Sequence, residues 1–134
     1  MKSILSMFCL CGVLFFASSC EKDEGKLPNI AFKTGGIYTS ASKIVALGDT
    51  IVVGISASKS EDKDVLKTFD VSRSYDGGAN VSVLNQTLTG TEADAFEGDI
   101  KITARNTPGT EKFLFTVINR DGLKNTIDLT LTVQ

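Results

Sequence analysis

The chain has 134 residues, with 14 Lys and Arg against 16 Asp and Glu and a formal net charge of −2. This length is typical of one domain, and the weak acid excess argues against a nucleic-acid partner, which requires a basic surface. The chain contains no His, so it lacks the commonest general base and the commonest metal ligand. We therefore expect no enzymatic activity, no catalytic residues, no cofactor and no metal.

The N-terminal segment has the features of a secretory signal. Lys2 precedes an almost entirely apolar run from Ile4 to Ala17, and Cys20 follows two serines. A positive residue, an apolar stretch of about 7–15 residues and small residues before a cleavage point make up a signal peptide. The run is shorter than the roughly 20 residues that span a bilayer, which disfavours an uncleaved anchor, and a buried core helix is the other alternative. We predict a signal peptide at residues 1–19.

The residues before Cys20 allow two cleavage mechanisms. Ala17 and Ser19 are small enough for ordinary signal peptidase, which would yield a secreted protein. The segment Phe16-Ala17-Ser18-Ser19-Cys20 also resembles the lipobox of bacterial lipoproteins, although the family usually carries Leu at the position of Ala17. This resemblance implies that Cys20 receives a diacylglyceryl group on sulfur and becomes the new N-terminus, which would anchor the protein to a membrane.

Cysteine usage favours lipidation of Cys20. The other two cysteines, Cys9 and Cys11, lie inside the apolar run and would leave with the signal peptide. Cys20 would then be a single thiol in an exported protein, which calls for an explanation. Lipidation supplies one, because two or three acyl chains hold a protein firmly at a membrane.

The segment Glu21-Lys22-Asp23-Glu24 directly follows Cys20. It resembles the acidic export signal of Bacteroidetes lipoproteins, which implies an outer-membrane protein that faces the cell exterior. The alternative is a solvated charged tether, which would equally suit the periplasmic leaflet. We predict a lipidated acidic tether at residues 20–28.

From residue 29 onward, apolar and polar residues alternate in short segments, which predicts half-buried β-strands. The strands are expected at residues 27–33, 50–58, 65–73, 80–87, 96–104, 113–117 and 127–133. Val81 and Val83 are expected to face inward. Asp76-Gly77-Gly78 and Asn119-Arg120-Asp121-Gly122 are typical of hairpin turns.

About seven short strands with regular turn signals predict a single immunoglobulin-like antiparallel β-sandwich over residues 29–134. The hairpin from Phe113 to Val133 resembles the end of bacterial immunoglobulin-like and cadherin-like modules of surface proteins. The Cys pair and Trp of antibody domains are missing from this region. A related β-barrel is the structural alternative.

Acidic residues are the most plentiful candidates for chemistry. One group surrounds the predicted strand at residues 96–104 and consists of Glu92, Asp94, Glu97 and Asp99. A glycosidase needs two carboxylates across a cleft, but Glu97 and Asp99 share the face opposite Ile100 and Ile102, so we expect a charged surface. Cadherin-like modules bind calcium through loop carboxylates, so the resemblance makes the loop acids candidate calcium ligands. These acids are Glu61, Asp62, Asp64, Asp76 and Asp121. No segment has the ligand spacing of a calcium loop, so we expect no metal.

Two tyrosines are the candidates for contact with sugars. Sugar rings usually stack on flat aromatic side chains, and this chain has no Trp and only Tyr38 and Tyr75. The sequence favours a non-catalytic, lipid-anchored cell-surface protein that mediates binding or assembly through a protein partner or a glycan. The alternative is a glycan-binding accessory module of a polysaccharide-uptake system.

Overall fold

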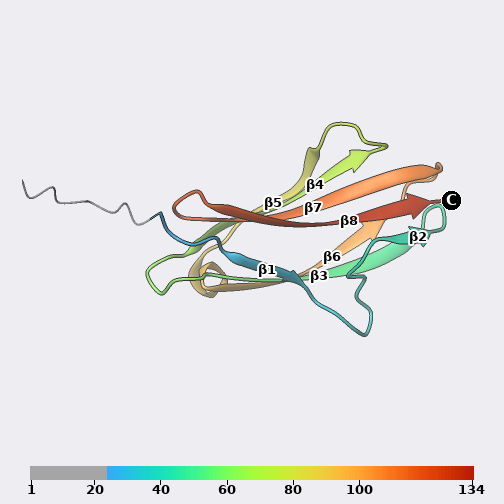
Figure 1. Cartoon of the computed structure of the whole chain (residues 1–134). Helices are drawn as coiled ribbons and strands as arrows, with labels where there is room; N and C mark the ends of the chain where they lie inside the picture. Colours follow the sequence, from blue (N-terminus) through green and yellow to red (C-terminus); the bar gives the residue numbers. More distant parts are fainter. Residues whose placement is uncertain (1–23) are drawn as a thin grey trace, which may run out of the picture.

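The computed structural model describes residues 24–134, which form two β-sheets packed face to face (Figure 1). The predicted signal peptide at residues 1–19 and the predicted lipidation residue Cys20 lie outside the described residues. The elements are β1 (Asn29–Phe32), β2 (Lys43–Val45), β3 (Thr50–Ser58), β4 (Leu66–Tyr75), β5 (Val81–Thr87), the 3₁₀ turn η1 (Gly90–Ala93), β6 (Ala95–Thr103), β7 (Gly109–Asn119) and β8 (Lys124–Val133). The predicted immunoglobulin-like β-sandwich is confirmed.

The two sheets differ in width. One sheet has the strand order β1-β3-β6, and the other has the order β2-β8-β7-β4-β5. Every neighbouring pair is antiparallel except β2 and β8, which run parallel. Within residues 24–134 we find no helix that is long and apolar enough to cross a membrane.

The core lies between the sheets and follows the alternation of the sequence. Strand β3 buries Ile51, Val53, Ile55 and Ala57, whose exposed fractions are between 0% and 6%. Each such aliphatic side chain contributes about 1.5–3 kcal/mol when fully buried. Aromatic contacts also join the sheets: the ring centroids of Phe69 on β4 and Phe96 on β6 lie 4.9 Å apart.

The turns between strands also follow the sequence. Asp76 and Gly77 have φ angles of 51° and 77°, so both central residues of the β4–β5 turn are left-handed. Asp tolerates this region better than most residues and Gly adopts it freely. The predicted turn at Asp76-Gly77-Gly78 is therefore confirmed, as is the β7–β8 hairpin.

Two features differ from the sequence-based predictions. Strand β2 was not predicted, because three residues are too few to show alternation, and it forms by pairing with β8. The predicted burial of Val81 and Val83 on β5 is wrong, since these side chains are 62% and 48% exposed. Strand β5 forms as predicted, but it extends the wider sheet past the edge of the narrower one.

Candidate functional site

A groove runs between β5 and β6, at the side of the sandwich where the wider sheet overhangs the narrower one. The contact between Phe96 and Phe69 places β6 over β4, so β5, the next strand outward, has no described strand facing it. The groove has a volume of about 230 Å³. Its lining consists of Val71 and Arg73 from β4, Val83 and Leu84 from β5, the consecutive residues Ile100–Thr103 of β6, and Phe113 from β7.

The floor of the groove is apolar and its mouth is exposed. Val71 and Phe113 are buried at the floor, with exposed fractions of 1% and 3%. Leu84 pairs with Val71 across the β4–β5 ladder, so it lies on the inner face of the sheet, yet it is 37% exposed. Soluble monomers rarely leave several large apolar side chains together at the surface without a function.

The charged residues of this lining are Arg73 and Lys101, and both are cationic. The guanidinium of Arg73 lies 4.5 Å from the ring centroid of Tyr75, which supports it by a cation–π contact. Arg105 lies 5.0 Å from the same ring. The overall chain is weakly acidic, so the groove has the opposite charge sign to the molecule.

An ion pair holds Arg105 beside Tyr75. Arg105 Nη2 donates to Asp76 Oδ1 at 2.6 Å, and the backbone N–H of Thr110 donates to the same oxygen at 2.8 Å. The hydrogen bond from Arg105 and then that from Thr110 hold the pKa of Asp76 below its ordinary value. The β4–β5 turn is thereby joined to the loop before β7.

The outer side of β5 is attached to β4 by Asp70. Its carboxylate accepts hydrogen bonds from Ser82 and Asn85 on β5 and from Ser72 on its own strand. Burial raises the pKa of Asp70, but the hydrogen bonds from Ser82, Asn85 and Ser72 together outweigh it, so the pKa lies below its ordinary value. These bonds hold β5 in place although none of the described strands faces it.

The predicted sugar-contact residue Tyr38 lies on the outer face of the narrower sheet. A Cβ atom at Gly54 would approach Tyr38 Cε1 to 2.7 Å, so the ring lies directly over this glycine. Tyr38 Oη donates to Asp99 Oδ2 at 3.2 Å, and Lys33 Nζ lies 5.5 Å from the ring centroid. The second candidate, Tyr75, lies elsewhere, at the end of β4.

The predicted charged surface on β6 is organised around Lys33. Lys33 Nζ lies 2.9 Å from Glu97 Oε2 and 3.1 Å from Asp99 Oδ1. The hydrogen bonds to Glu97 and Asp99 raise the pKa of Lys33, and the hydrogen bond from Lys33 lowers the pKa of Glu97. The other two acids have different partners: Glu92 accepts from Gln86, and Asp94 pairs with Lys59.

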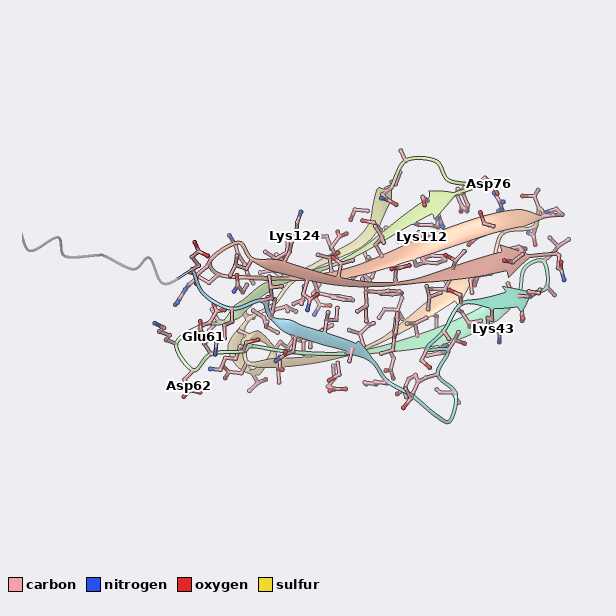
Figure 2. All side chains as sticks on the ribbon, viewed as in Figure 1. Lys43, Glu61, Asp62, Asp76, Lys112 and Lys124 are labelled. Carbon is pink, nitrogen blue, oxygen red and sulfur yellow. The ribbon has the colours of Figure 1, made fainter. Side chains whose placement is uncertain are left out.

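The loop acids weighed for calcium do not all converge. Glu61 and Asp121 lie near each other, since a Cβ at Gly25 would be 4.0 Å from Glu61 Oε2 and 3.6 Å from Asp121 Oδ2. Figure 2 shows Glu61 and Asp62 at one end of the sandwich and Asp76 toward the other. Asp64 is buried, and its two oxygens accept hydrogen bonds from the Val65 N–H and from Asn119. Within residues 24–134, no three His, Cys, Asp or Glu side chains are grouped so that they could hold a metal ion.

Sequence reasoning missed the groove. Its residues come from positions 71–113 and meet only in the folded sandwich. A partial signal was available, because Val81, Val83 and Leu84 follow the β4–β5 turn shortly after Arg73. That pattern predicts a strand with an apolar face, but it does not show that the face lacks a covering sheet.

Comparisons with known proteins bear on the fold alone. No protein-family model and no curated protein sequence matches the chain. Among solved structures, the chain is similar to a superoxide reductase (neelaredoxin) from Ignicoccus hospitalis, with 11% identity over 81% of this chain and 80% of that chain and a TM-score of 0.54. A second Ignicoccus hospitalis superoxide reductase structure has 9% identity over 81% of both chains and a TM-score of 0.51. A murine CRIg structure has 9% identity over 81% of this chain and 99% of that chain, with a TM-score of 0.42. The likeness to the two superoxide reductase structures supports the β-sandwich fold and transfers no activity.

Proposed function

We propose that this protein is a non-catalytic, lipid-anchored protein of the bacterial cell surface that acts in binding or assembly, with the groove between β5 and β6 as its binding site. The observation that carries the proposal is the uncovered inner face of β5, where Val83 and Leu84 border an apolar groove. Exposed apolar surface with a polar rim is typical of interaction sites.

The position of the N-terminal segment supports an anchored arrangement. The carbonyl oxygens of Lys26 and Pro28 accept hydrogen bonds from Asn119 and Asn125, at 3.3 and 2.9 Å. The chain therefore joins the sandwich at the end formed by the β7–β8 turn (Figure 1). An anchor at Cys20 would leave a short link of at most about 20 Å and would leave the side with the groove open to a partner.

The lipid anchor is tested by metabolic labelling with an alkynyl fatty acid. We expect the protein to be labelled in cells and the Cys20→Ala variant to lack the label. Labelling of that variant would contradict the anchor. Protease added to intact cells should remove the domain if it faces the exterior, and full protection would place it on the periplasmic leaflet.

The binding site is tested by photo-crosslinking in intact cells. A photoreactive amino acid at position 84 lies at the mouth of the groove, and one at position 124 lies on the outer face of the wider sheet, where Lys124 is labelled in Figure 2. We expect a discrete crosslinked species from position 84 and none from position 124. Equal products from both positions, or none from position 84, would contradict binding through the groove.

The second candidate is a glycan-binding accessory module of a polysaccharide-uptake system. The observation that favours it is the Tyr38 ring, held over Gly54 by its bond to Asp99 with Lys33 beside it. A glycan array with the Tyr38→Ala and Tyr75→Ala variants separates the two functions. Binding that depends on Tyr38 would favour the glycan module over the groove.

A further inference from the structure

We infer that the groove accepts an extended polypeptide segment of a partner protein, rich in alternating apolar and acidic residues, which adds to the narrower sheet as a new strand beside β6. This inference rests on the proposed binding function and names the chemistry of the partner. Strand addition to a free sheet edge is a general mode of peptide recognition.

The lining shows that the groove follows the edge of β6. Four consecutive residues, Ile100–Thr103, line it, although successive side chains of a strand point to opposite faces. Both faces of a strand can contribute to one groove only along its edge. Among the described strands β6 pairs with β3 alone, so its other edge carries backbone groups without a ladder partner.

The dimensions favour a strand over a helix. A strand beside β6 would lie about 4.8 Å from it and about 10 Å from the facing sheet, where β5 has no strand of residues 24–134 opposite it. Its alternate side chains would then pack on Leu84 and Val83. A helix has a diameter of about 10–12 Å, so it could not lie at the spacing of about 4.8 Å at which a neighbouring strand bonds to the edge of β6.

The charges define the other side chains of the segment. Arg73 and Lys101 line the groove, and no acidic residue of the described chain lines it with them. On a strand beside β6, an incoming Asp or Glu that faces away from β5 would form a charge-assisted bond with Lys101, whereas Arg73 lies on the inner face with Phe113. An incoming Lys or Arg would be repelled, so the charge provides specificity.

The structure favours a different protein over another part of this chain. The ends of the described chain are tied elsewhere: Lys26 and Pro28 bond to Asn119 and Asn125, and the Gln134 N–H donates to the Val45 carbonyl. A second copy would offer its own β6 edge, but the acids of that strand, Glu97 and Asp99, already pair with Lys33. A segment with free acids therefore fits better.

The test uses the membrane-extracted protein in detergent and a fluorescent decapeptide of alternating valine and glutamate. Two matched peptides serve as controls: one has N-methyl groups on alternate residues, which removes backbone donors, and one has lysine in place of glutamate. By fluorescence anisotropy we expect the first peptide to bind, the N-methylated peptide to bind at least about tenfold more weakly, and the lysine peptide not to bind.

Charge reversal in the protein provides the matched variants. We expect Lys101→Glu to weaken binding of the glutamate peptide about fivefold or more, and Lys124→Glu, outside the groove, to leave it unchanged. Equal binding of all three peptides, or an unchanged affinity in Lys101→Glu, would overturn the inference.

Two further outcomes separate this inference from the proposed function and from self-association. If position 84 crosslinks to a partner in cells while the peptides do not discriminate, strand addition is wrong and binding through the groove stands. If sedimentation shows a dimer that Leu84→Asp dissociates, a second copy occupies the groove and the inference fails.

Discussion

Strands β8 and β5 lie on opposite sides of the wider sheet, and the narrower sheet covers β8 but not β5. Strand β8 pairs with β2 and β7 and is contacted by β1 from the other sheet, and its Leu129, Leu131 and Val133 are at most 1% exposed. Strand β5 pairs with β4 alone among the described strands, and its Val81 is 62% exposed. The narrower sheet therefore covers one side of the wider sheet and leaves the other side exposed.

The two ends of the β4–β7 pair show a similar contrast in buried polar groups. At one end Asn119 Nδ2 donates to Asp64 Oδ2 at 2.6 Å, and the Leu123 N–H donates to Asn119 Oδ1 at 2.8 Å. At the other end the Arg105 N–H donates to Glu111 Oε1 at 2.7 Å. There, Glu111 Oε2 and Arg105 Nε find no hydrogen-bond partner among residues 24–134. The end with Glu111 therefore has buried polar atoms without hydrogen-bond partners, whereas both side-chain polar atoms of Asn119 are hydrogen-bonded.

The largest expected effect is on the closed side. Phe115 is fully buried and its ring lies 5.6 Å from that of Phe32, so Phe115→Ala should lower the free energy of unfolding by about 3–5 kcal/mol. Leu84→Ala on the open side should cost less than about 1 kcal/mol, because its side chain is already partly solvated. Urea denaturation measures the free energy of unfolding of both variants. Similar losses of stability would contradict the difference in burial between the two sides of the sandwich.

The second-largest difference in stability is expected between substitutions at the two ends of the β4–β7 pair. Asn119→Ala leaves the buried Asp64 Oδ2 and the Leu123 N–H without their partners, which should cost about 2–4 kcal/mol. Glu111→Gln keeps an oxygen for the Arg105 N–H, but it removes the charge 4.0 Å from Arg105 Nε and buries an NH2 group without an acceptor, so it should cost about 1–2 kcal/mol. Thermal unfolding of the two variants compares the ends, and a larger loss in Glu111→Gln would reverse the comparison.

A smaller and pH-dependent effect is expected at Asp70. Because its pKa is lower in the folded protein, its carboxylate stabilises the fold fully above the ordinary value of 3.8, and the contribution is lost as the pH falls through the folded pKa. Asp70→Asn should cost under about 1 kcal/mol at pH 7, since the group is partly solvated. Melting curves of both proteins from neutral to acidic pH should converge. A constant difference at every pH would contradict this.

The smallest effect is expected for Val81→Thr, which exchanges a methyl group for a hydroxyl at an exposed position of β5. The free energy of unfolding should change by no more than about 0.5 kcal/mol. Hydrogen exchange of the β5 amides should also remain the same. A loss above about 1.5 kcal/mol would show that Val81 is covered in solution.

Most of the fold could be predicted from local patterns. The alternation in β3 correctly identified Ile51, Val53, Ile55 and Ala57 as buried, and the φ angles of Asp76 and Gly77 match their predicted turn. Strand β2 could not be predicted, since its three residues owe their conformation to β8. The lipidation of Cys20 stays a prediction, because it lies outside residues 24–134.

The candidate site illustrates what a sequence determines and what it leaves to the tertiary structure. The sequence by itself determined every described strand except β2, together with the turns, because alternation and turn chemistry are local properties. Only the tertiary structure decided that three strands face five, so that β5 is uncovered and Arg73, Leu84 and Lys101 meet in one groove. The physical reason is that burial depends on which distant strand packs against a face, and no local pattern records that partner.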